Sequence, residues 1–182
     1  LFLNLDHFNE FIDILHRCVF EEKFILITHN SDTSFTDNHY LALENYVSKV
    51  YAINNICTNP NVKTIPIGFR YEPVNTIDII QNIPNIINEK PFLLYMNFAI
   101  VSNPPKRIEC FSTFQDKAWV TKEESVSIEE FYISILKSKY ILSPEGTGID
   151  CHRIYESIYF NSIPIMKTTP MDNFYKRFPI II

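Results

Sequence analysis

Two spacings of apolar residues alternate along the chain, and they predict helices and strands in turn. Within residues 6–20, five apolar positions lie three or four apart, which is the stripe of an amphipathic helix: Phe8, Phe11, Ile12, Leu15 and Val19. Similar spacing predicts helices at 39–49, 105–115, 127–138 and 150–160. The helix at 127–138 begins with Ser127 as N-cap and Glu130 at the capping-box position.

Short runs of apolar and β-branched residues separate these helices. They predict strands at 23–28, 50–54, 62–69, 91–100, 118–121, 139–144 and 163–166. Residues 71–90 show no clear pattern, and we expect a short helix and a linker there. Alternation of this kind favours an α/β fold with parallel sheets flanked by helices, in two halves, 1–90 and 91–182. Ligands of such sheets bind beyond the carboxyl ends of the strands, so the loops at 28–38, 97–107 and 143–150 are the candidate sites.

Composition narrows the classes of function. The chain has 182 residues, 46% of them hydrophobic, which suffices for a real core. Its formal charge of -5 argues against nucleic acid as a partner, so an anionic ligand must meet a few placed cations. The four cysteines form no C-x-x-C pair, and we expect no metal site. No apolar run is long enough to span a membrane, which predicts no membrane contact from this segment.

The loop at 143–150 holds two of the three glycines of the chain. Gly146 and Gly148 would allow a sharp turn and a ligand against bare backbone, and Asp150 could cap the following helix. Arg153 lies in the first turn of that helix, where the dipole disfavours a cation unless an anion binds there. Glu156, one turn further, could accept both hydroxyls of a ribose.

A simpler interpretation of this loop stays open. The glycines could only form a turn, and Arg153 and Glu156 could form an exposed pair worth about 0.2–0.5 kcal/mol. The loop matches neither G-x-G-x-x-G nor G-x-x-x-x-G-K-[ST], so it supports neither a dinucleotide oxidoreductase nor a nucleoside triphosphatase.

The segment "KYILSPEGTGIDCHRIYESIYFNSIPIM" resembles the nucleotide-sugar segment of exostosin-like (GT47-like) glycosyltransferases. That family's pattern reads roughly as a strand, S-P-R-G-x-G-x-D-x-H-R, W/Y-E-A and G-x-I-P-I. The segments "THNSD", "IPIGF" and Asn103 to Arg107 extend the resemblance along almost the whole chain. It implies a GT-B type fold of two Rossmann-like halves, with the acceptor on the N-terminal half and the donor on the C-terminal half.

The resemblance also implies donor-binding residues, a nucleotide diphosphate sugar as donor substrate, and no metal or other cofactor. The donor-binding residues would be Arg107, Ser143, Glu145, Gly146, Thr147, Gly148, Asp150, His152, Arg153 and Glu156. Two positions depart from the pattern. Glu145 replaces an arginine, which puts donor choice or activity in question, and Lys106 or Arg107 would have to supply the missing charge. Asn161-Ser162 replaces a Gly-Cys or Gly-Ser pair.

Polar residues that follow the strand at 23–28 are the candidates for catalysis. An inverting transfer needs a base to take the proton of the acceptor hydroxyl, and Asp32 or His29 could serve. Asn30 and Ser31 would contact the acceptor. The alternative is that these residues only cap turns and the next helix, with His29 a structural residue.

The sequence therefore predicts a glycosyltransferase that moves a sugar to a hydroxyl of a glycan or glycoprotein. The alternative is an inactive nucleotide- or glycan-binding module of the same fold. We expect a chain trimmed at both ends, cytoplasmic as it stands, or in the Golgi lumen if an anchor precedes it.

Overall fold

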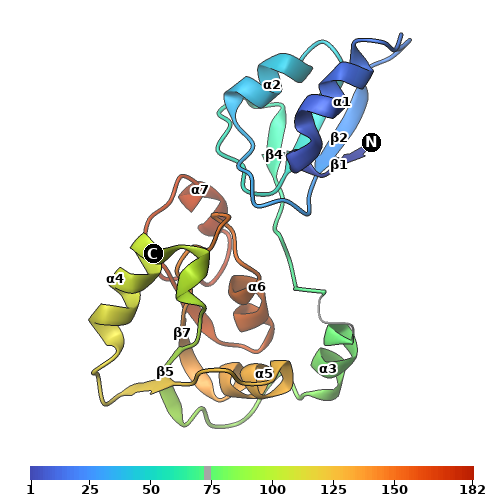
Figure 1. The fold of residues 1–182 in the computed structure, drawn as a ribbon. Coiled ribbons are helices and arrows are strands. Elements are labelled where there is room, and N and C mark those ends of the chain that lie inside the picture. The colour runs from blue at the N-terminus through green and yellow to red at the C-terminus, as the bar shows by residue number, and fades with distance from the viewer. Residues whose placement is uncertain (72–74) are drawn as a thin grey trace. The chain divides into compact units, whose positions relative to one another are not determined.

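The computed structural model describes residues 1–71 and 75–182, which divide into two units by their internal contacts. Unit 1 comprises residues 1–67 with 148–150, and unit 2 comprises 68–147 with 151–182. Each unit holds one four-stranded parallel sheet with helices against it, which confirms the predicted α/β fold of two Rossmann-like halves (Figure 1).

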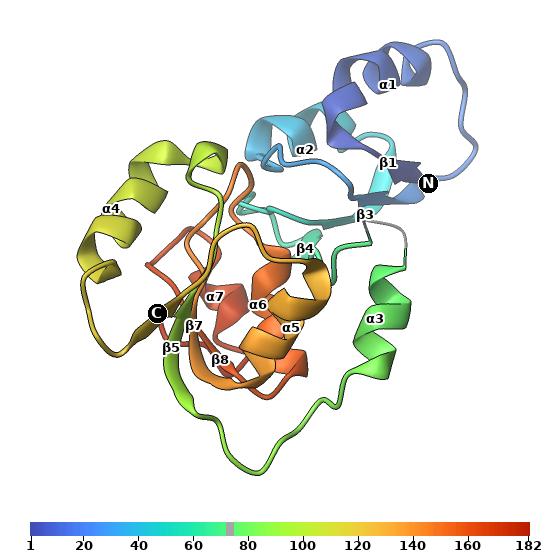
Figure 2. The ribbon, with the colours of Figure 1, turned by 60° about the horizontal axis from the view of Figure 1, so that its bottom comes forward.

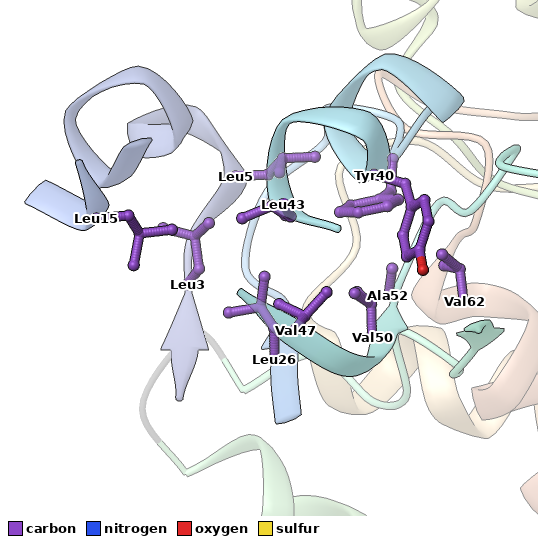
Figure 3. Close-up of a cluster of buried hydrophobic side chains, with 11 residues drawn as sticks. Leu3, Leu5, Leu15, Leu26, Tyr40, Leu43, Val47, Val50, Ala52 and Val62 are labelled. Atoms are coloured by element: carbon purple, nitrogen blue, oxygen red, sulfur yellow. The ribbon is translucent and has the colours of Figure 1, made fainter. Parts of the chain in front are cut away.

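The sheet of unit 1 has the strand order β1-β2-β3-β4. Its elements are β1 (Phe2–Leu3), η1 (Leu5–His7), α1 (Phe8–Leu15), β2 (Phe24–Thr28), α2 (Asp37–Leu43), β3 (Val47–Ala52) and β4 (Val62–Thr64). Side chains from α1, α2 and one face of the sheet form a single apolar core (Figure 3). Leu26 and Val50 of neighbouring strands point into this core beside Leu43 of α2, because alternate strand residues face the same side of a sheet.

The sheet of unit 2 has the strand order β6-β5-β7-β8. Its elements are α3 (Thr76–Asn82), β5 (Phe92–Met96), η2 (Ile100–Ser102), α4 (Pro104–Phe114), β6 (Val120–Lys122), α5 (Ile128–Leu136), β7 (Ser138–Leu142), α6 (His152–Tyr159), β8 (Ile163–Ile165) and α7 (Asp172–Tyr175). Figure 2 shows α4 and α5 on opposite sides of β5 and β7. Tyr95 packs with Phe131 of α5, whereas its neighbours Leu94 and Met96 pack with Phe111 of α4.

Several predicted boundaries are wrong. The helix predicted at 39–49 ends at Leu43, and Val47 already belongs to β3, where it faces the core. The helix predicted at 6–20 covers only Phe8–Leu15, preceded by the short η1. The strand β1 and the helix α7 were not predicted.

The predicted division near residue 90 falls inside unit 2. The reason is that α3 belongs to the core of unit 2: Ile80 and Ile83 pack with Phe131 and Ile135 of α5. The short helix expected within 71–90 is this α3, and residues 72–74 of that range lie outside the described residues.

Candidate functional site

A pocket of about 690 Å³ lies wholly within unit 2. Its wall includes residues 97–99, which follow β5, and residues 123–127, which connect β6 to α5. It therefore lies at the carboxyl ends of parallel strands, where α/β sheets bind ligands, and its size suits a small molecule. Three of the five arginines of the chain line it: Arg70, Arg107 and Arg153.

Arg153 is buried, with only 8% of its surface accessible to solvent. It lies in the first turn of α6, and its buried Nε has no hydrogen-bond partner. Burial, and then the positive charges of Arg107 and Arg70, lower the pKa of Arg153. A buried N–H without a partner costs about 1–3 kcal/mol, so this guanidinium is suited to meet an anion.

Arg107 of α4 is also buried, so it is not a solvated helix residue. Its Nε donates to the Glu145 carbonyl at 2.9 Å and its Nη1 to the Ala99 carbonyl at 2.6 Å. Both acceptors are neutral, so they orient the guanidinium without cancelling its charge. The Phe98 ring lies 5.7 Å from the Arg107 guanidinium and 5.8 Å from that of Arg153, within the range of cation–π contact.

Arg70, in contrast, has an anionic partner. Its Nε donates to Glu156 Oε1 at 2.7 Å and its Nη2 to Oε2 at 3.1 Å, while Tyr132 donates to Oε1 at 3.0 Å. Arg153 and Glu156 are thus both buried and do not pair, so the alternative of an exposed ion pair is wrong. The ribose contact of Glu156 stays a prediction, and in this structure both of its oxygens already accept hydrogen bonds.

Sequence analysis did not single out Arg70. The available signal was that Arg70 directly follows the "IPIGF" segment and lies two residues after Gly68. Gly68 has a φ of 72°, and its carbonyl accepts a hydrogen bond from His152 Nδ1 at 2.8 Å. His152, a predicted donor residue, therefore holds the chain just before Arg70.

The glycines of the loop at 143–150 permit close packing. Both are buried, and neither has a positive φ. A methyl group on Gly146 would lie 2.9 Å from Nη2 of Arg107, and one on Gly148 would lie 2.8 Å from Nδ2 of Asn54. The carbonyl of Gly146 accepts a hydrogen bond from Asn103 at 2.9 Å. Gly146 thus makes room for a pocket arginine.

Three more predicted donor residues lie in the same loop. Ser143 is fully buried, and its hydroxyl lies 3.4 Å from a backbone carbonyl two residues earlier. The carboxylate of Glu145 forms an ion pair with Lys106, which leaves no uncompensated charge on that lysine. Thr147 is exposed and donates to the Ser102 carbonyl at 3.3 Å. None of the three lines the pocket.

Asp150 does not cap α6, which corrects the prediction. The residue at the N-cap position of α6 is Cys151. Instead, Asp150 belongs to unit 1, where its Oδ2 accepts a hydrogen bond from the Ile67 backbone N–H at 2.8 Å.

The predicted catalytic and acceptor residues lie together in unit 1, in the turn that follows β2. His29 Nδ1 and Asn30 Oδ1 are 2.8 Å apart, and Asn30 has a φ of 59°. The Ser31 hydroxyl donates to Asp6 Oδ1 at 2.6 Å, and this bond contributes most to lowering the pKa of Asp6. Asp32 is exposed. The roles of all four as base or acceptor contacts stay predictions.

Two searches of residues 1–71 and 75–182 bear on other classes of site. No three histidine, cysteine or acidic side chains there are grouped so that they could hold a metal ion. The helices in the same ranges are all too short or too polar to cross a membrane.

Comparison with known proteins finds similarity to one kind of transferase. Residues 96–174 match the model of the RXYLT1 C-terminal domain. Over 49 residues the chain is 35% identical to ribitol-5-phosphate xylosyltransferase 1 of Mus musculus, a match that covers 27% of this chain and 11% of the mouse protein. The region matched by the domain model contains Arg107 and Arg153. The resemblance to the exostosin-like family stays a prediction.

Proposed function

We propose that this chain is part of a glycosyltransferase that transfers a sugar from a nucleotide diphosphate sugar to a hydroxyl group of a glycan or glycoprotein. The observation that carries the proposal is the pocket of unit 2, where buried Arg107 and Arg153 make no ion pair with any described residue. The similarity of residues 96–174 to a domain named after a xylosyltransferase supports it, and makes a xylose donor the first to test.

The arginines suit the chemistry of the leaving group. A departing nucleoside diphosphate gains negative charge in the transition state, and fixed donors stabilise that charge without having to reorganise. Arg107 is held by two carbonyls and faces the same ring as Arg153, so both guanidinium groups are positioned before the ligand arrives. With this charge supplied by side chains, the transfer needs no metal, and Asp32 or His29 would act as the base of an inverting reaction.

A catalytically inactive binding module of the same fold is the second candidate. The ion pair between Glu145 and Lys106 favours it, because this pair removes a cation that the donor could otherwise use. Release of free sugar from a nucleotide sugar, or its transfer to an acceptor, distinguishes an enzyme from a module that only binds.

Calorimetry with UDP and GDP, each with and without EDTA, tests the proposed site. We expect binding that EDTA leaves unchanged and that Arg153→Ala weakens at least tenfold, since a charge-assisted hydrogen bond contributes about 1.5–3 kcal/mol. Arg17→Ala is the matched control, because Arg17 is exposed and lies in unit 1. Equal affinity of the parent and Arg153→Ala would remove the main support for the proposal.

A further inference from the structure

The pocket that holds the arginines also presents a fixed carboxylate. Glu123 directly follows β6, lines the pocket and is half-buried. Its neighbour Glu124 also lines the pocket but is exposed, as expected for a solvated side chain.

Three contacts hold Glu123 in place. Its Oε2 accepts hydrogen bonds from the Tyr95 hydroxyl at 2.9 Å and from the Ser134 hydroxyl at 2.8 Å. Its backbone carbonyl accepts a third from the Asn97 side chain at 2.9 Å. Tyr95 and Ser134 are buried, so the donors themselves are fixed by packing. The other oxygen, Oε1, receives no hydrogen bond in the part of the chain that the structure describes, and it can accept two.

Glu123 and the arginines do not neutralise one another. Within residues 1–71 and 75–182, Glu123 forms no ion pair with Arg70, Arg107 or Arg153, although all four side chains line one pocket. The opposite charges are kept apart by their own anchors: carbonyl groups for Arg107, and hydroxyl groups for Glu123. A ligand that fills this pocket must therefore offer negative charge to one wall and hydrogen-bond donors to the other.

We propose that Glu123 recognises the donor by accepting hydrogen bonds from neighbouring hydroxyl groups of a pentose attached to the diphosphate. This inference rests on the proposed function, since it assigns the diphosphate to Arg107 and Arg153. A pair of adjacent hydroxyls matches one carboxylate oxygen with two open acceptor sites, which Oε1 of Glu123 provides. Glu156 does not line the pocket and holds Arg70 and Tyr132, while Glu124 is exposed. Glu123 is therefore the pocket carboxylate that is both held in place and has an oxygen left to accept hydrogen bonds.

The test compares three ligands on Glu123→Gln and on Glu129→Gln as the control, because Glu129 is exposed and does not line the pocket. The ligands are pyrophosphate, which has no hydroxyl groups, UDP and UDP-xylose. We expect Glu123→Gln to lower the affinity for UDP about tenfold or more, because a charge-assisted hydrogen bond is lost. The affinity for pyrophosphate should stay the same or rise, because the substitution removes a negative charge from the pocket. The control should bind all three ligands as the parent does.

The choice of ligands identifies the pentose. A loss of affinity for UDP assigns the hydroxyls to the ribose, and the 2′,3′-dideoxy analogue of UDP should then bind the parent and Glu123→Gln equally. A loss seen only with UDP-xylose assigns them to the transferred sugar. If Glu123→Gln does not fold, Tyr95→Phe serves instead, because it removes one hydrogen bond that holds the Glu123 carboxylate. This variant should lower the affinity for the hydroxyl-bearing ligand without changing that for pyrophosphate.

Two results would overturn the inference, and they differ in what else they remove. If pyrophosphate and UDP bind the parent but Glu123→Gln changes neither UDP nor UDP-xylose, Glu123 has no role in recognition and the proposed function stands. If neither pyrophosphate nor any nucleotide binds the parent, the proposed function fails and this inference fails with it.

Discussion

Replacing Arg153 with methionine should stabilise the free protein while weakening nucleotide binding at least tenfold. In the absence of ligand, Arg153 is a buried cation whose Nε has no partner and whose pKa is lowered by burial and by two nearby arginines. Methionine has a similar length and adapts to irregular space, so Arg153→Met removes the unsatisfied group without leaving a large cavity.

The size of this effect follows from the group that is lost. An unsatisfied buried donor costs about 1–3 kcal/mol, so the free energy of unfolding should rise by about that amount. For a chain of this length, about 1 kcal/mol corresponds to a rise in Tm of about 2–4 °C. UDP at a hundred times the parent's Kd should add about 2.7 kcal/mol to the parent, and at most about 1.4 kcal/mol to a variant whose affinity is weakened tenfold or more.

The same substitution at Arg70 should have the opposite sign and serves as the matched comparison. Arg70→Met leaves the fully buried Glu156 without its cation, and breaking a buried ion pair costs about 3–5 kcal/mol. The Arg70 side chain is 31% exposed, so water reduces the loss to about 2–3 kcal/mol.

Urea unfolding of the three proteins, with and without UDP, measures both effects. Differential scanning calorimetry supplies the corresponding Tm values. If Arg153→Met destabilises the free protein as much as Arg70→Met does, Arg153 is a structural residue, and the argument that its unmet Nε awaits an anion is refuted.

Three further predictions concern other parts of the chain. Asp32→Asn should lower sugar transfer about 10²–10⁴-fold and leave UDP affinity unchanged in calorimetry, and transfer at the parent rate would make Asp32 only a turn residue. Burial lowers the pKa of His39, whose Nδ1 accepts a backbone hydrogen bond in the α2 capping box, so the neutral form is favoured in the folded state. Stability should therefore fall as pH drops below about 6.5, by no more than about 1 kcal/mol, and His39→Gln should remove that part of the pH dependence in urea titrations at pH 7 and pH 5. Gly146→Ala should displace Arg107 and lower the affinity for UDP, and equal UDP affinity of this variant and the parent would contradict this role of the loop. Gly68→Ala, which has no close contacts but is strained at its positive φ, should instead lower the free energy of unfolding by about 1–2 kcal/mol.

Local patterns predicted most of the secondary structure. The strand predicted at 23–28 is β2, and the helix predicted at 127–138 is α5, complete with the capping box of Ser127 and Glu130. These features depend on spacing and on contacts between residues a few positions apart, which the sequence shows directly. The same method failed at 47–49, where pairing with β2 overrides helical spacing and places Val47 in a strand.

The sequence by itself also determined that the chain forms parallel sheets with helices against them, and it pointed to Arg107 and Arg153 as cations for an anion. It could not show that Glu156 belongs to Arg70, because these residues are 86 positions apart and only the packing of unit 2 brings them together. Nor could it show that Gly146 makes room for Arg107, since a glycine needed for close packing and one needed for a turn look alike in a sequence. The tertiary structure decided which charges are cancelled and which are left open, because charge compensation depends on distances between side chains that periodicity does not encode.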